Sequence, residues 1–175
     1  MLYLITWLTD FAAFLLVFTV PRLLAEQEAD AFMLGFIGTL FSAGSVFSNA
    51  ISGRLSDRHG RRIVATTGTI LLFVSICGAT WLQPGHWSYY ISFAAAGGSL
   101  GIIYPSLIAW LGHGRSGKHA SRAFLGFCLA FNLGMISGQL AGGWLFQHWG
   151  PQPALYLAMA LTAVSVGLLS RVRGE

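Results

Sequence analysis

Charged residues are scarce in this sequence, and their scarcity excludes an ordinary soluble domain. Only 9% of the 175 residues are charged, whereas 55% are hydrophobic and the mean hydropathy is +0.66. A soluble domain usually carries about 25% charged residues to cover its surface. Uncharged apolar stretches of about 20 residues instead predict transmembrane helices.

Cysteine is also scarce, and no metal-binding pattern accompanies it. Cys77 and Cys128 lie far apart within apolar segments and form no CxxC motif. A disulfide framework or a cysteine-based metal centre is therefore not expected. The five histidines lie in predicted loops or at span ends without the spacing of metal ligands. We expect neither a metal nor a cofactor.

Six hydrophobic segments are long enough to cross a bilayer, and only short connections separate them. The segments are Leu2–Leu24, Ala31–Gly53, Ile63–Leu82, Trp87–Leu111, Ala123–Phe146 and Ala154–Leu169. No linker is long enough to separate two domains. We therefore predict an all-α integral membrane protein in which residues 1–175 form a single six-helix bundle.

The distribution of basic residues predicts the orientation of the spans, because Lys and Arg collect in cytoplasmic loops. If the N-terminus is cytoplasmic, Arg22 is the one basic residue outside. The others then lie inside: Arg54, Arg58, Arg61, Arg62, Arg115, Lys118, Arg122, Arg171 and Arg173. We expect a plasma-membrane protein with both termini in the cytoplasm. A nucleic-acid partner is not expected, because these residues lie between apolar spans rather than on one polar face.

Residue spacing predicts an internal repeat of three helices. A shift of 90 residues aligns the second and fifth segments, pairing Gly44 with Gly134, Asn49 with Gln139 and Gly53 with Gly143. Repeat one then covers about residues 1–83 and repeat two about residues 87–171. Because three is odd, the second copy enters the membrane from the opposite face, as in many secondary transporters. Chance alignment of glycine-rich helices is the alternative.

The sequence GRLSDRHGRR, from Gly53 to Arg62, resembles the signature loop of the major facilitator superfamily. The resemblance extends in helix number and loop length over the whole chain, and it corresponds to the N-terminal six-helix half of that family's twelve-helix fold. It implies a transporter rather than an enzyme, and a latch between two halves. The latch candidates are Gly53, Arg54, Asp57, Arg58, Gly60, Arg61 and Arg62. A positive-inside anchor is the alternative.

Helical spacing within this segment predicts ion pairs. Arg54 lies three residues before Asp57 and Arg61 lies four residues after it. Residues three or four apart are neighbours on a helix surface. We therefore expect the carboxylate of Asp57 to be paired with one or both arginines.

The fifth segment carries a second resemblance. Its pattern of Gly134, Gly138, Gly142 and Gly143 is similar to a motif of proton-coupled, drug-efflux-like antiporters of the same superfamily. The resemblance favours proton-coupled export, although Gln139 stands where that motif has proline. Close packing of helices through small residues is the alternative explanation of the four glycines.

Asp10 is the one acidic residue within a predicted span. At 1.5 Å per residue it lies about 12 Å from Leu2, near the middle of a ~30 Å hydrocarbon core. A carboxylate at this depth is costly and commonly faces a cavity or a partner. Asp10 is therefore the proton-coupling candidate, and a hydrogen bond that fixes helix packing is the alternative.

Four other polar side chains are predicted to lie at depth. They are Asn49, Tyr104, Asn132 and Gln139. Each is a candidate for the substrate pathway or, alternatively, for a hydrogen bond between helices. Because polar groups at depth are few, we expect a hydrophobic or weakly polar solute.

These observations favour a secondary active transporter that moves a small solute by alternating access. Its expected partners are the lipid bilayer, the solute and protons. The alternative is a non-transporting six-helix fragment, or a half-transporter that needs a second six-helix half. That second half is either a separate chain or a second copy of this one.

Overall fold

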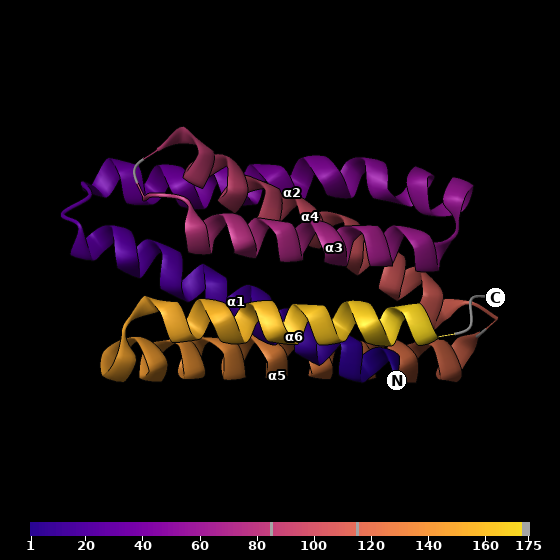
Figure 1. Cartoon of the computed structure of the whole chain (residues 1–175). Coiled ribbons are helices and arrows are strands. Elements are labelled where there is room, and N and C mark those ends of the chain that lie inside the picture. The colour runs from indigo at the N-terminus through magenta and orange to yellow at the C-terminus, as the bar shows by residue number, and fades with distance from the viewer. Residues whose placement is uncertain (85, 115, 173–175) are drawn as a thin grey trace.

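The computed structural model describes residues 1–84, 86–114 and 116–172, which form six α-helices (Figure 1). The helices are α1 (Leu2–Glu26), α2 (Ala31–His59), α3 (Arg61–Trp81), α4 (Trp87–Gly112), α5 (Gly117–Trp149) and α6 (Pro151–Arg171). Each is long and apolar enough to cross a membrane. The predicted all-α fold with six spans is confirmed. Arg115 and Arg173, which contribute to the predicted charge distribution, lie outside the described residues.

The helices run up and down, so that connections alternate between the two ends of the bundle (Figure 1). The N-terminus, the α2–α3 turn and the last turn of α6 lie at one end. The α1–α2 and α5–α6 connections lie at the opposite end. Both ends of the described chain are therefore on one side, as an even number of spans requires.

The segment from Gly53 to Arg62 is almost entirely helical, so its prediction as a loop is wrong. α2 continues to His59 and α3 begins at Arg61, which leaves Gly60 between them. Gly60 has a φ of +87°, a conformation that residues with a side chain rarely adopt. The charged residues after Gly53 lower the hydropathy of the sequence, but the backbone keeps its helical hydrogen bonds through them to the end of α2 at His59. Basic side chains also stabilise the C-terminal end of a helix.

Glycine forms the two most extensive helix crossings of the bundle, α5 with α1 and α4 with α2. Where α5 crosses α1, a Cβ on Gly138 would lie 2.6 Å from the carbonyl oxygen of Phe11. Where α4 crosses α2, Gly97 lies directly against the carbonyl group of Phe41. Because glycine has no side chain, the two backbones can approach closely, which is how membrane helices commonly pack.

The two crossings have equivalent positions in the predicted repeat. α1 packs on α5 and α6, while α4 packs on α2 and α3. At corresponding places, Gly134 lies against Asp10 of α1 and Gly44 lies against Ala94 of α4. The bounds of the two repeats stay a prediction, which these matching contacts support.

α1 and α4 supply most of the buried core, whereas α2 lies largely at the surface. Among the described residues of α2, only Ile37, Ser52 and Ser56 are buried. Large apolar side chains such as Phe47 on α2 and Leu140 on α5 are exposed. Such surfaces suit lipid or another membrane segment rather than water.

Candidate functional site

Asp10 lies where α1 crosses α5, and the bundle encloses it completely. A Cβ on Gly134 would lie only 2.6 Å from the Cβ of Asp10. Any residue larger than glycine at position 134 would therefore displace Asp10 or separate the two helices. The first glycine of the motif in α5 is thus a direct neighbour of the buried acid.

The carboxylate of Asp10 has a polar partner on another helix. The hydroxyl group of Tyr104, on α4, donates a hydrogen bond to Oδ1. Oδ2 is buried and has no hydrogen-bond partner among the described residues. An unsatisfied buried oxygen is costly, so Oδ2 is the atom at which a proton would be bound most favourably.

Aromatic rings of α5 pack against the Tyr104 ring. The Tyr104 ring meets Phe131 edge-on with 5.3 Å between ring centroids, and Phe131 meets Phe14 at 6.2 Å. Phe127 lies 6.4 Å from Tyr104 on the same side of α5 as Phe131. These edge-to-face contacts restrain the Tyr104 ring and hold its hydroxyl against Asp10.

Phe127 and Phe131 are not among the residues predicted from the sequence. Their spacing of four residues places them on one face of α5. That spacing was the one signal that could have found them, and it also describes ordinary core packing. Their relation to Tyr104 depends on how α5 lies against α4.

The other three pathway candidates do not join Asp10. Asn49, Asn132 and Gln139 are exposed on the outer surfaces of α2 and α5. The side-chain amide of Asn132 donates to a carbonyl oxygen one turn earlier in its own helix, at 2.7 Å. Of the four candidates, Tyr104 is the one that the fold brings to the buried acid.

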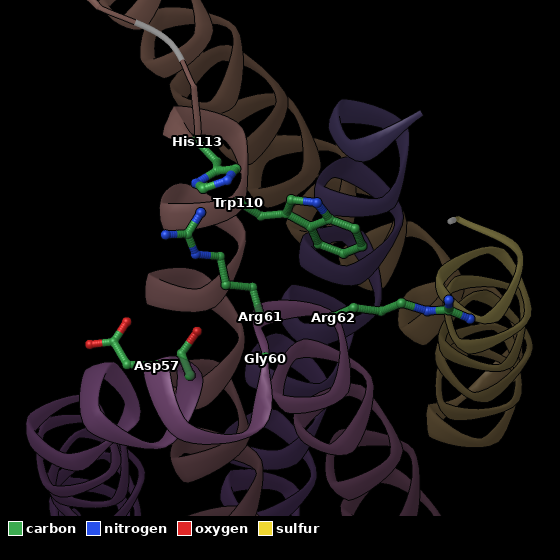
Figure 2. A pocket seen from close by; sticks show the side chains of 7 residues that line it. Asp57, Gly60, Arg61, Arg62, Trp110 and His113 are labelled. Carbon is green, nitrogen blue, oxygen red and sulfur yellow. The ribbon is translucent and has the colours of Figure 1, made fainter. Parts of the chain in front are cut away.

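The signature segment borders a cavity (Figure 2) at the end of the bundle where the N-terminus lies (Figure 1). The cavity has a volume of about 210 Å³ and is lined by Ser56, Asp57, Gly60, Arg61, Arg62, Trp110 and His113. Figure 2 shows Arg61 extending toward His113 and Arg62 extending the opposite way, toward α6. Trp110 and His113 come from the end of α4, so only the tertiary fold brings them to the motif.

The predicted ion pairs of Asp57 do not form within the described residues. The one salt bridge among the described residues joins Arg22 to Glu26 on α1, at 3.5 Å, and does not involve Asp57. Asp57 and Arg61 lie on different helices, because α2 ends between them. Helical i, i+4 geometry therefore does not apply to that pair, and the expectation of a paired Asp57 is wrong.

Arg62 instead has a partner on α6. Its guanidinium group donates a hydrogen bond of 2.5 Å to the carbonyl oxygen of Ser170, in the last turn of that helix (Figure 2). Carbonyl groups in a last turn lack helical partners and carry partial negative charge. Arg62 therefore caps α6 and joins it to α3, while its predicted role in a latch stays a prediction.

The described residues offer no obvious metal site. Within them, no three His, Cys, Asp or Glu side chains lie close enough together to hold a metal ion. Cys77 and Cys128 are free, half-buried thiols on α3 and α5. The chemistry of the site therefore depends on one buried carboxylate and the hydroxyl group bonded to it.

Comparison with protein families identifies the architecture. The family model described as Major Facilitator Superfamily matches residues 2–174, almost the whole chain. The chain belongs to the major facilitator superfamily. Its helices and its signature segment at the α2–α3 turn are thus those of a multi-pass membrane protein of this superfamily. The prediction that it is no enzyme is confirmed by this membership.

Curated relatives of this superfamily member include several named transport proteins. ZINC INDUCED FACILITATOR-LIKE 1 of Arabidopsis thaliana is 28% identical over 136 residues, which are 76% of this chain and 28% of the relative. Human solute carrier family 67 member A1 is 28% identical over 149 residues, 81% of this chain and 34% of the relative. The D-xylose-proton symporter of Escherichia coli is 33% identical over 72 residues, which are 41% of this chain and 14% of the relative. The chain spans about a third of the length of the first two relatives.

Proposed function

We propose that this chain supplies six helices of a secondary active transporter, which moves a small solute across the plasma membrane by alternating access. Asp10 is its proton-coupling group. The observation that carries this proposal is the enclosed carboxylate of Asp10, with Oδ1 bonded to Tyr104 and Oδ2 unpartnered among the described residues. The name of one relative, a D-xylose-proton symporter, supports coupling to protons.

Proton binding at Oδ2 would change the energy of the α1–α5 crossing. A charged carboxylate is costly to enclose in a membrane protein, whereas the neutral acid is much less so. Protonation therefore favours the packed arrangement in which Gly134 lies against Asp10. A bound proton shifts a conformational equilibrium by its differential affinity for the two states, and this difference provides the coupling.

We further propose that the solute is exported in exchange for protons and is hydrophobic or weakly polar. The glycine motif of α5 supports the antiporter type, and two of its residues, Gly134 and Gly138, pack directly on α1 around Asp10. The ring of Tyr104, which is bonded to Asp10, packs against Phe127 and Phe131, and these apolar rings suit an apolar solute. Gln139 stands where the motif has proline, but the four glycines of the motif are all present in α5.

The end of the bundle that carries the signature segment is proposed to be cytoplasmic. The basic residues of α2, α3 and the start of α5 lie toward that end, whereas Arg22 lies toward the other. Positively charged loops are retained on the cytoplasmic side of a membrane. The N-terminus and the end of α6 are then cytoplasmic as well.

A second six-helix half is proposed to complete the transporter, as a separate chain or a second copy. Exposed polar side chains support this, because Asn49 on α2 and Asn132 and Gln139 on α5 would be costly against lipid. The latch candidates Arg54, Asp57 and Arg58 at the end of α2 are also exposed and available to that half. The alternative, a six-helix module without transport activity, is supported by the same exposed surfaces.

Proton-coupled flux in proteoliposomes tests the proposal directly. The chain is reconstituted with a pH-sensitive dye inside, and either ethidium or D-xylose is added outside as the probe solute. Exchange predicts that ethidium entry drives proton exit, so the internal pH rises. Cotransport predicts that D-xylose lowers the internal pH, so the sign of the change distinguishes the two mechanisms.

Replacing the coupling group gives the decisive comparison. Asp10→Asn should abolish the solute-driven pH change, because an amide cannot exchange a proton in this range. Asp30→Asn is the matched control, since Asp30 caps α2 by accepting from the Met33 amide at 2.7 Å and asparagine caps a helix equally well. Full coupled flux in Asp10→Asn would remove Asp10 from the mechanism.

A further inference from the structure

A second cavity lies beside the signature segment, between α3 and α6. It has a volume of about 530 Å³. It is lined by His59, Gly60, Arg61, Arg62, Ile63, Thr66, Thr67 and Ser170. These described lining residues include two arginines and no acidic residue; the Arg62 side chain extends toward α6, whereas that of Arg61 extends toward His113 (Figure 2). The cavity is therefore electropositive, and the coupling group Asp10 does not line it.

Within the described residues, Arg62 keeps donors that point to this cavity without a partner. One N–H of its guanidinium group reaches the carbonyl oxygen of Ser170, and a guanidinium carries five such donors. The remaining donors suit a phosphate group, which arginine binds through paired hydrogen bonds.

The start of α3 strengthens the attraction for an anion. No side chain caps the first backbone N–H groups of this 21-residue helix. These groups carry the positive end of the helix dipole. Thr67 adds an exposed hydroxyl group one turn further along the cavity wall. Cationic side chains, amide groups and hydroxyl groups are the donors that phosphate groups require.

An exposed apolar stripe begins at the edge of this cavity. Ile63, Ile70 and Val74 are 61%, 46% and 58% exposed on α3. Their spacing of seven and then four residues places them on one face of the helix, with Thr67 between the first two. An electropositive cavity that continues into an apolar stripe matches an amphiphile with an anionic head and hydrocarbon tails.

We propose that the α3–α6 cavity binds the phosphate group of an anionic membrane phospholipid, whose acyl chains lie along the α3 stripe. Arg62 would then bind the lipid phosphate and the last turn of α6 at once. A bound lipid would strengthen the contact between α3 and α6. Free phosphate shares this headgroup chemistry but would gain nothing from the apolar stripe. The proposal does not depend on transport activity.

Native mass spectrometry of the purified chain in detergent tests this proposal. The probes are phosphatidylglycerol, diacylglycerol with the same acyl chains, and soluble glycerol phosphate. We expect phosphatidylglycerol to remain bound, diacylglycerol to bind weakly and glycerol phosphate to compete poorly. Arg62→Gln should lower the bound fraction of phosphatidylglycerol about fivefold, as expected for the loss of one basic residue near an anionic lipid.

Two further variants make the outcome specific. Thr67→Glu places a negative charge in the cavity while Arg62 and its bond to α6 remain, so it should also reduce phosphatidylglycerol binding. Lys118→Gln removes an equal charge from the start of α5, outside the cavity, and should leave binding unchanged. Equal binding by the unmodified chain and both cavity variants would overturn the proposal. Strong competition by glycerol phosphate would overturn the assignment to a lipid.

Discussion

Tyr104 and Asp10 are 94 residues apart in the chain, yet their hydrogen bond is the one polar contact that the fold makes to the buried acid within the described residues. The contact joins α1 to α4, so it also joins the two predicted repeats. A tyrosine hydroxyl can donate a hydrogen bond to a carboxylate or to the carbonyl oxygen of the neutral acid. Tyr104 therefore acts as a positioning residue for Asp10 in both protonation states.

Tyr104→Phe tests this role at the scale of one hydroxyl group. The variant keeps the ring contacts with Phe127 and Phe131 but leaves Oδ1 of Asp10 without its donor. We expect the free energy of unfolding to fall by on the order of 1 kcal/mol, a typical value for a hydrogen bond between membrane helices. We also expect the solute-driven proton flux to fall about fivefold if Asp10 couples transport.

The matched control for this variant is Tyr156→Phe, because Tyr156 on α6 is 53% exposed. The same hydroxyl is lost there without any effect expected on Asp10. A double-mutant cycle with Asp10→Asn separates positioning from general destabilisation. Additive effects of the two substitutions would contradict the proposed role of Tyr104.

At the scale of the helices, glycine spacing decides which elements cross closely. Gly134, Gly138 and Gly142 recur every four residues along α5 and all face α1. From the sequence alone, close helix packing and an antiporter motif are alternative explanations of these glycines. The contacts show that the two are compatible, because the packed face is also the face that encloses Asp10.

Gly138→Ala should open the α1–α5 crossing. The new Cβ would lie 2.6 Å from the carbonyl oxygen of Phe11, closer than two such atoms can approach. Overpacking of this kind costs about 1–3 kcal/mol of the free energy of unfolding. Thermal unfolding in detergent, followed by circular dichroism, measures the loss.

Gly35→Ala on α2 is the control for this substitution. A Cβ at position 35 would meet no atom within 4 Å, and alanine favours a helix over glycine by about 1 kcal/mol. Its stability should be unchanged or slightly higher. A Gly138→Ala variant as stable as Gly35→Ala would show that the crossing tolerates a side chain.

At the scale of the whole molecule, the buried and exposed faces differ from those of a soluble bundle. The enclosed centre holds the carboxylate of Asp10, bonded to the half-buried Tyr104, while large apolar side chains on α2 and α5 remain exposed. The exposed amides of Asn49, Asn132 and Gln139 lie on these same two helices. This mixture of apolar and amide side chains favours a protein partner over lipid alone.

Native mass spectrometry of the purified chain tests whether it pairs with itself. We expect a complex of twice the 18.8 kDa mass of one chain, formed through α2 and α5. Leu140→Glu on α5 should dissociate it, because a charge in an apolar interface is costly. Val164→Glu on α6 is the control on an equally apolar, exposed face. A strictly monomeric chain without coupled flux would favour the non-transporting alternative.

Sequence alone determined the features that depend on local hydrophobicity and on short motifs. Runs of about 20 apolar residues predict membrane helices wherever they occur. The six spans could therefore be predicted directly, and their even number places the first and last helix ends on the same side. The match of GRLSDRHGRR indicated the superfamily, and the isolation of Asp10 within an apolar run marked it as the candidate acid. Helix ends were less certain, because polar turns can continue a helix beyond the apolar run.

Only the tertiary structure decided which distant residues meet. The pairing of Asp10 with Tyr104, the bond from Arg62 to α6 and the exposure of Asn49 depend on how whole helices rotate and cross. Hydropathy cannot predict those rotations, because apolar residues on all faces of a membrane helix leave it without a distinct buried side. Glycine contacts and a few polar bonds set them instead, through short-range packing between segments far apart in the chain.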